Sequence, residues 1–532
     1  MNRNLKLCMC YLVLCLWNKA GLAQGYGTLV AGIMGLIITT THMLDRKAWK
    51  KDVLVLFTPL YILVLFAFLA SNNPVTKIIS KNDLVGLNLE ETILNSKNPN
   101  KINFFLNSIN SITQENEPDA TSRIAKFYYY KNSFKDKYKL DNNDTFINFY
   151  NNLEDKFLLE FNNLLPRSII GGYQYVYEIY FLFINLSIGI FVYLNVKNRT
   201  EVKTCLTIIV LNAICLVLLG FYQKYDQQWS PEYKEILGIW DAPEPRYYFS
   251  TFTYKNHWCA FAILSLFSTL SLMYLKYRDY PFNILHSKFF IILIIIFIAI
   301  YSSILFSGSR SGILIASIAL IIFLVLIFRN NFTFNFNNIK KILYFNIIFI
   351  PLLFFVLTHL TRDQKIKEMV VTTKNQFNEF KRGKAPLRWL LWQDTSKMIQ
   401  QSKWYGHGYN SFSAIYPKFQ SLEVRQQRAI GLENAHQPYV PLVAHAHSDF
   451  LEFLSEWGLL GAFLIFLPYC LHLLKVFLFS FSNASRLMLA GCITFLIYCL
   501  IDFPSRTPAC LVMFSVVAGL GVGYSKISSS IN

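Results

Sequence analysis

The residues best suited to chemistry gather in one short stretch, His445-Ala446-His447-Ser448-Asp449-Phe450-Leu451-Glu452. It places two histidines and two carboxylates at the start of a long apolar segment that reaches Cys470. Ionisable groups inside hydrocarbon are costly, so such a cluster beside a membrane span indicates contact with water or a function. Histidine titrates near neutral pH and can take a proton from an attacking hydroxyl. We therefore predict that this stretch is the reaction centre.

The elements that must hold this stretch are predicted to be membrane helices. The chain has 532 residues, 54% of them hydrophobic, and its apolar runs approach the roughly 17 to 25 residues that cross a bilayer. The first run can also be a signal peptide, because a basic start and an apolar stretch precede residues 20–23. We predict an all-α integral membrane protein with about twelve transmembrane helices, near 5–17, 26–43, 52–70, 171–195, 203–222, 257–276, 289–307, 311–328, 343–358, 449–474, 486–501 and 508–524.

The formal net charge of +18 could indicate a nucleic-acid partner, but its distribution indicates a membrane topology instead. Basic residues concentrate in four short connections that alternate with connections that are not basic: 44–51, 196–203, 276–288 and 329–341. Under the positive-inside rule, these connections and both termini lie in the cytoplasm. The ten cysteines are mostly within apolar runs and lack CxxC spacing, which predicts packing residues. We therefore expect no nucleic-acid partner, no metal and no cofactor.

Two long connections are predicted to lie outside the cytoplasm. The insertion, residues 72–168, has twelve Lys/Arg against twelve Asp/Glu and a helical spacing of aromatic residues between Ile124 and Leu165. It either covers the membrane face or contacts a partner, or it recognises the acceptor. The large loop, residues 359–446, has thirteen Lys/Arg against six Asp/Glu, which predicts an anionic partner. The remaining divisions are 1–71 with three spans, 169–358 with six, and 447–532 with three and a cytoplasmic tail.

Four further residues could belong to a site. Ser309 and Arg310 lie in a Gly/Ser turn before the 311–328 span, where a guanidinium and the first helix amides form an anion site unless the arginine only extends to the interface. His257 opens another span, where it caps the helix or joins the site. Arg388 lies in a predicted amphipathic helix of the large loop, where pairing with Asp394 is the alternative.

These residues are predicted to meet at one surface. With alternating topology, the spans that begin near His257, Arg310 and His447 all run inward from the outer face, and the loop with Arg388 lies over them. Two arginines and three helix N-termini suit a pyrophosphate, whose charge they can neutralise without a metal. The interiors of the spans lack the charged relay that ion pumps use.

Three patterns now resemble bacterial O-antigen ligases and polymerases. Arg310 to Leu314 is similar to the Arg-x3-Leu motif of that family. His447-Ser448, followed after nine residues by Gly458-x2-Gly461, resembles its His-(Asn/Ser/Gln)-x9-Gly-x2-Gly motif, whose glycines we expect to allow close helix packing. Arg388 in an Arg-x3-Trp setting, then Gly406-His407-Gly408, resembles the periplasmic loop of the same family. The similarity covers roughly residues 245–525.

The resemblance implies a metal-independent glycosyltransferase of the bacterial inner membrane, active on the periplasmic side. The donor would be a glycan on undecaprenyl pyrophosphate, and the acceptor lipid A core or another surface glycan, as in lipopolysaccharide biosynthesis. Arg310 and Arg388 would hold the pyrophosphate, with Ser309 and His257 beside them. His447 would activate the acceptor hydroxyl or assist the leaving group.

Other assignments stay open at this point. Asp449 or His445 is expected to orient His447, although Asp449 could only cap the helix. An O-antigen or exopolysaccharide polymerase and a protein O-oligosaccharyltransferase share the donor and differ in the acceptor. A lipid-linked glycan flippase is the alternative without chemistry. It should need charged groups deep in the spans, whereas the unusual polar groups here collect at one predicted face.

Overall fold

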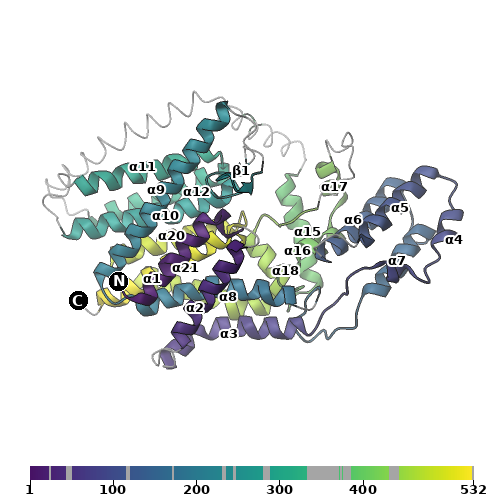
Figure 1. The fold of residues 1–532 in the computed structure, drawn as a ribbon, viewed down its shortest axis with the longest axis horizontal. Coiled ribbons are helices and arrows are strands. Elements are labelled where there is room, and N and C mark those ends of the chain that lie inside the picture. Colours follow the sequence, from purple (N-terminus) through teal and green to yellow (C-terminus); the bar gives the residue numbers. More distant parts are fainter. Residues whose placement is uncertain are drawn as a thin grey trace. The chain divides into compact units, whose positions relative to one another are not determined.

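The chain forms two compact units, each assembled from separate stretches of sequence. The computed structural model describes residues 1–22, 26–43, 51–114, 120–170, 173–229, 235–243, 247–279, 288–331, 371, 374, 385–429 and 442–529. Unit 1 comprises 1–57, 184–384 and 470–532, and unit 2 comprises 58–183 and 385–469. Apart from two short strands, regular structure in the described residues is helical, which confirms the all-α prediction (Figure 1).

Unit 1 is a bundle of long apolar helices. Its hairpin pairs β1 (Glu235–Ile236) antiparallel with β2 (Trp240–Asp241). Three helices, α3 (Lys51–Ser71), α8 (Tyr173–Asn195) and α19 (Leu467–Phe479), run across the division between the units. The other helices of unit 1 are α1 (Arg3–Trp17), η1 (Lys19–Gly21), α2 (Tyr26–Met43), α9 (Arg199–Trp229), α10 (Lys255–Asp279), α11 (Lys288–Ser307), α12 (Arg310–Asn331), α20 (Asn483–Cys499), η6 (Pro504–Arg506) and α21 (Pro508–Ser529).

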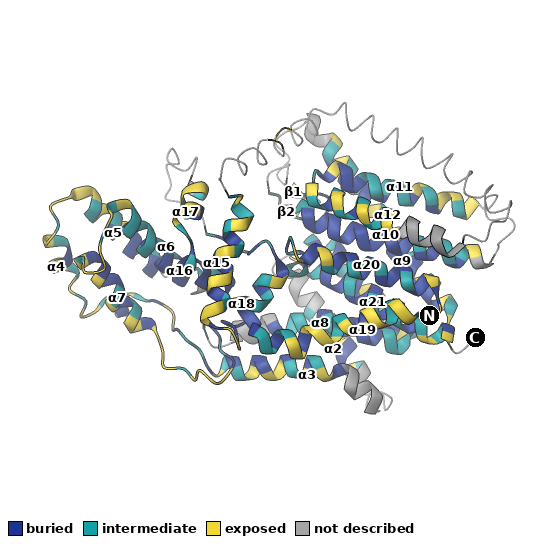
Figure 2. Cartoon of the chain, turned by 180° about the vertical axis from the view of Figure 1, so that it is seen from behind, coloured by how far each residue is buried: buried dark blue, intermediate teal, exposed yellow. Residues whose placement is uncertain are grey.

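Helix α10 is the centre of unit 1. It packs against α9, α11, α20 and α21, and its residues are almost all buried (Figure 2). Small side chains allow this, and the hydroxyls among them donate hydrogen bonds to carbonyl oxygens one turn earlier in the same helix. Ser265 donates to Phe261 O over 3.0 Å, and Thr269 donates to Ser265 O over 2.8 Å. Each such bond satisfies a hydroxyl group that would be costly to bury in an apolar interior without a partner.

Helices coincide with the predicted spans wherever the described residues allow the comparison. The predicted span at 343–358 lies outside those residues. Among the described residues, five helical stretches are long and apolar enough to cross a membrane by length and composition: 199–225, 255–277, 288–307, 449–479 and 508–529. Shorter apolar helices lie at 32–41, 57–71, 179–195, 310–322 and 483–499. The chain is therefore a multi-pass membrane protein, and the count of twelve spans stays a prediction.

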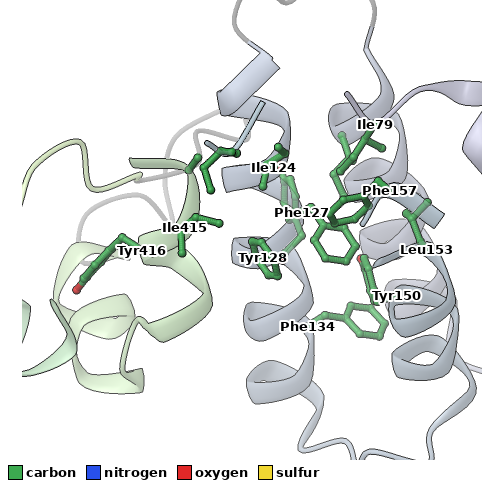
Figure 3. Packing of buried hydrophobic residues seen from close by; sticks show 14 of the residues in the cluster. Ile79, Ile124, Phe127, Tyr128, Phe134, Tyr150, Leu153, Phe157, Ile415 and Tyr416 are labelled. Atoms are coloured by element: carbon green, nitrogen blue, oxygen red, sulfur yellow. The ribbon is translucent and has the colours of Figure 1, made fainter. Parts of the chain in front are cut away.

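Unit 2 joins the described parts of the insertion and of the large loop around one hydrophobic core. The insertion contributes η3 (Lys81–Leu84), α4 (Leu89–Leu94), α5 (Pro99–Thr113), α6 (Ala120–Tyr138) and α7 (Thr145–Phe157). The loop contributes α15 (Leu387–Gln401), α16 (Phe412–Phe419) and α17 (Leu422–Ala429), and it leads into α18 (Asp449–Gly461) and the π-helical turn η5 (Ala462–Phe466). Buried aromatic rings of α6 and α7 face one another, and Ile415 and Tyr416 of α16 belong to the same cluster (Figure 3).

Polar contacts also join the insertion to the loop. Helix α16 packs on α6, and Asn132 Nδ2 donates to Pro417 O over 2.8 Å. Arg425 forms an ion pair with Asp136, and Lys418 Nζ lies 3.4 Å from Glu154 Oε1. Acidic residues of the insertion thus neutralise part of the positive charge of the loop. That charge was the basis for predicting an anionic partner.

Truncating a buried ring of the insertion should loosen the loop as well. Phe127 is fully buried on α6, between Tyr128, Tyr150 and Phe157. Replacing Phe127 with Ala removes a core ring and should lower the free energy of unfolding of unit 2 by about 3–5 kcal/mol. Hydrogen–deuterium exchange should then speed up in α16 as well as in α6, because the two helices share this core.

The matched control is Leu94→Ala, which removes a side chain that is 82% exposed on the same insertion. It should leave exchange in both helices as in the wild type. Faster exchange in α6 with unchanged exchange in α16 would contradict the shared core.

Candidate functional site

The predicted site residues divide between the two units. Ser309, Arg310 and His257 belong to unit 1, and Arg388, His445, His447 and Asp449 belong to unit 2. Within unit 2, one connected structure contains all four residues. It consists of the segment 443–448, helix α18, and the part of the loop that runs from α15 to the turn at 403–408.

A carboxylate organises the segment before α18. Glu452 is 1% exposed, and its Oε1 lies 2.9 Å from His445 Nδ1 while its Oε2 accepts a 2.9 Å hydrogen bond from the Ala446 amide. Helix side chains lean toward the N-terminus, so Glu452 reaches back to the chain that enters α18. Ser448 is the N-cap, because its hydroxyl accepts from the Leu451 amide. The capping role considered for Asp449 thus falls to Ser448, and Asp449 is buried in the first turn.

His447 is held in the form that can accept a proton. Burial, followed by the charges of Arg388, His445 and Arg428, lowers the pKa of its imidazole to about 4, against the Glu452 carboxylate, which raises it. The side chain is therefore neutral at pH 7. Its backbone has a φ of 53°, a left-handed conformation that is uncommon for a residue other than glycine and often marks functional positions.

Arg388 reaches this segment from the first turn of α15. Pro386 precedes the helix with a φ of −59°, close to the value that a helix start requires. Leu391 and Met398 are buried at helical spacing on α15, and Arg388 lies at the edge of this buried face and is partly exposed. Asp394, the alternative partner considered for Arg388, instead accepts hydrogen bonds from the amide and hydroxyl of Ser421, each over 2.8 Å.

Helix α18 is broken at Gly458, and the turn at 403–408 repairs the break. Gly458 has φ 65° and ψ −173°, so the two helical hydrogen bonds that would cross it cannot form. The amides of His407 and Gly408 donate to the freed carbonyls of Ser455 and Glu456, each over 2.8 Å. The freed amides of residues 459 and 460 donate to the carbonyls of residues 403 and 404, over 2.9 and 3.1 Å. The close approach expected at Gly458 is thus made by a turn and not by a neighbouring helix.

The same turn is fixed by two further side chains. His407 is buried, and its Nε2 lies 3.0 Å from Met398 O at the end of α15. Burial lowers the pKa of His407 to about 3, with a contribution from the charge of Arg167, so the ring is neutral. Arg167, from the end of the insertion, donates from Nε to Gly406 O over 3.0 Å. His407 therefore connects the turn to the end of α15, and Arg167 of the insertion helps to hold the turn.

In unit 1, a buried polar network fixes the start of α12. The Ser309 hydroxyl accepts from the Gly312 amide over 3.1 Å and donates to Asn256 Oδ1 over 2.6 Å. Asn256 Nδ2 donates in turn to the buried carboxylate of Asp502. These bonds use the Ser309 hydroxyl as a helix cap and leave Arg310, the first residue of α12, exposed.

His257 lies one residue beyond Asn256, near the start of α10, and is buried. Its Nδ1 lies 2.6 Å from Thr507 Oγ1, and its ring contacts Phe503 edge to face with centroids 4.7 Å apart. Among the three unit 1 candidates, Arg310 presents an exposed charge, whereas Ser309 and His257 are engaged inside the protein. Sequence reasoning placed Glu452 in the predicted reaction centre without a separate role, although a carboxylate in the first turn of α18 was a signal for one. It did not find the hydrogen bond between Asn256 and Asp502.

A family model described as O-antigen ligase matches residues 291–466, about a third of the chain. The matched region contains Arg310, Arg388 and His447, and it includes the whole of the turn at 403–408 and the break at Gly458. His257 lies outside it. No curated protein matches the chain.

A side chain at position 458 should destabilise unit 2. A Cβ there would lie 2.3 Å from Trp404 O, and the backbone conformation is one that essentially only glycine adopts. Gly458→Ala should lower the free energy of unfolding by at least about 1–3 kcal/mol from backbone strain alone. Thermal unfolding in detergent measures the loss, and Gly523→Ala on α21, where a Cβ makes ordinary contacts, is the control. Equal stability of both variants would contradict the repaired break.

The pKa of His447 can be tested without any assumption about activity. Because burial and cations disfavour the imidazolium, we expect a titration midpoint near pH 4, well below the usual value near 6.5. Replacing Arg388 with Gln should raise the midpoint, and replacing Arg428 should raise it less. NMR of labelled histidine, assigned by the loss of signal in His447→Gln, measures these values. A midpoint between 6 and 7 in the wild type would contradict this setting.

Proposed function

From the membership of residues 291–466 in the O-antigen ligase family, we propose that this membrane protein transfers a glycan from undecaprenyl pyrophosphate to an acceptor hydroxyl at the periplasmic face of the bacterial inner membrane. The family supports a membrane glycosyltransferase function and a lipid-linked glycan substrate. The observation that carries the specific proposal is the neutral, partly buried imidazole of His447, next to the positive charge of Arg388.

In the proposed reaction, His447 takes the proton of the acceptor hydroxyl as its oxygen attacks the anomeric carbon of the donor sugar. The bond between that carbon and the pyrophosphate oxygen breaks, and undecaprenyl pyrophosphate leaves with the bonding electrons. A neutral imidazole is required, because an imidazolium has no lone pair to receive the proton. The proton on His447 is released to water, directly or through the leaving group, before the next turnover.

The developing negative charge on the leaving group needs cations, and we assign this role to Arg388 and Arg310. A guanidinium forms paired hydrogen bonds with phosphate oxygens and remains protonated throughout, so two of them can neutralise a pyrophosphate without a metal. Arg310 is the first residue of α12, where the helix dipole also favours negative charge. Ser309 and His257 would then act by fixing the helix ends around Arg310.

The acceptor is the least constrained part of the proposal. The basic loop favours a phosphorylated acceptor such as lipid A core, but Arg425 and Lys418 are already paired with acidic residues of the insertion. Because Arg388 is assigned to the donor, the remaining argument rests on exposed basic residues such as Lys403. A growing polysaccharide or a protein acceptor would use the same donor chemistry and is distinguished by the product.

Loss of the imidazole should slow transfer strongly. With a lipid-linked glycan donor and membranes that contain candidate acceptors, His447→Ala should lower kcat by about 100- to 10,000-fold, the usual contribution of a general base. Glu423→Gln, on the exposed face of α17, is the control and should keep the wild-type rate. The glycosylated product of the wild type identifies lipid A core, a growing chain or a protein as the acceptor.

Two outcomes would reject the proposal. Equal transfer by wild type and His447→Ala would remove His447 from the mechanism. Movement of the lipid-linked glycan across the bilayer without any glycosylated product would identify a flippase.

A further inference from the structure

We propose that Glu452 is a positioning residue for the transfer reaction, whose carboxylate fixes the backbone that leads into His447 and so aims its imidazole. The inference rests on the proposed function, since it concerns the residue through which His447 acts. It differs from the expectation that Asp449 or His445 performs this task.

The Glu452 side chain holds the segment that leads into His447. Its carboxylate accepts from the Ala446 amide and lies 2.9 Å from His445 Nδ1. On the other side of His447, Ser448 is held by the helix itself, because its carbonyl accepts the backbone hydrogen bond of the first turn from the Glu452 amide over 3.0 Å. His447 therefore lies between a helix start and a segment fixed by the Glu452 carboxylate.

The contact with the Ala446 amide matters because His447 has a backbone conformation that an unconstrained segment would not keep. A positive φ at a residue with a Cβ persists only where surrounding contacts impose it. The direction of the His447 side chain depends on that backbone angle. Releasing the Ala446 amide would let the segment relax to an extended conformation and would turn the imidazole away from its present direction.

Simple helix capping does not account for Glu452. Ser448 already serves as the N-cap through its hydroxyl. A carboxylate in the first turn is favoured by the helix dipole at an exposed position too, but Glu452 is 1% exposed. A charge buried to this degree needs specific hydrogen bonds, and both of its oxygens have them in the segment that leads to His447.

The experiment compares Glu452→Ala, Glu452→Gln, His447→Ala and the control Glu423→Gln in the full-length protein. Misplacement of a reacting group by about 1 Å can cost 100-fold in rate. We expect Glu452→Ala to lower kcat on the order of 100-fold with the KM for the lipid-linked donor unchanged. Glu452→Gln keeps an oxygen that can accept from the Ala446 amide, so it should recover part of the rate.

A second measurement separates positioning from general destabilisation. Removing the Glu452 charge should lower the titration midpoint of His447, because that carboxylate favours the imidazolium. Glu452→Gln should show this shift together with a wild-type unfolding temperature. A variant that only unfolds would instead lose folded protein, and the remaining molecules would have the wild-type kcat and midpoint.

The failure of this inference is distinguishable from that of the proposed function. Wild-type kcat in both Glu452 variants, with His447→Ala inactive, would overturn the positioning role and leave the reaction intact. Full activity of His447→Ala would overturn the reaction itself. A raised donor KM with unchanged kcat would also overturn the inference, because it would place Glu452 in donor binding.

Discussion

The structure of unit 2 depends on a helix that is broken and then repaired. Peptide groups released at Gly458 cannot remain without partners at the start of a membrane span, because each would cost the free energy of a lost hydrogen bond. The turn at 403–408 supplies two donors and two acceptors at the required positions. The helix that begins beside His447 is thereby joined to the loop that carries Arg388. The Gly406-His407-Gly408 pattern and the Gly458-x2-Gly461 pattern, about 50 residues apart in the sequence, therefore form one connected structure.

The insertion extends the same dependence. Its helices share a hydrophobic core with α16, and Arg167 at its end holds the carbonyl of Gly406. The turn that repairs α18 is therefore braced by a segment that the sequence separates from it by more than two hundred residues. Removing the insertion would expose buried aromatic rings of the loop as well as its own. Its structural contribution to the loop is thus direct, whatever it contacts outside the chain.

Sequence patterns predicted the helices well because membrane spans depend on local properties, the length and polarity of a run. The sequence indicated His447 as a candidate site residue because ionisable side chains beside a membrane span are costly. The partners of these residues could not be predicted. Glu452 and Ala446 meet through the geometry of one helix start, and the turn at 403–408 meets α18 through backbone groups that no side-chain pattern reports. The partner of Ser309 was equally unpredictable, since nothing in its motif indicates that its hydroxyl donates to Asn256.

The electrostatics of His447 connect donor binding to proton transfer in the proposed reaction. With a pKa of about 4, the imidazole is neutral but is a weak base. General bases act best when their pKa lies near the working pH. Arg388 contributes to the low value, and a pyrophosphate bound to Arg388 would offset its charge. The pKa of His447 would then rise toward neutrality when the donor is in place. Arg388 would keep His447 unprotonated before the donor binds. Once the pyrophosphate offsets the charge of Arg388, His447 would be a stronger base. Proton abstraction would therefore be favoured when a leaving group is present to complete the transfer.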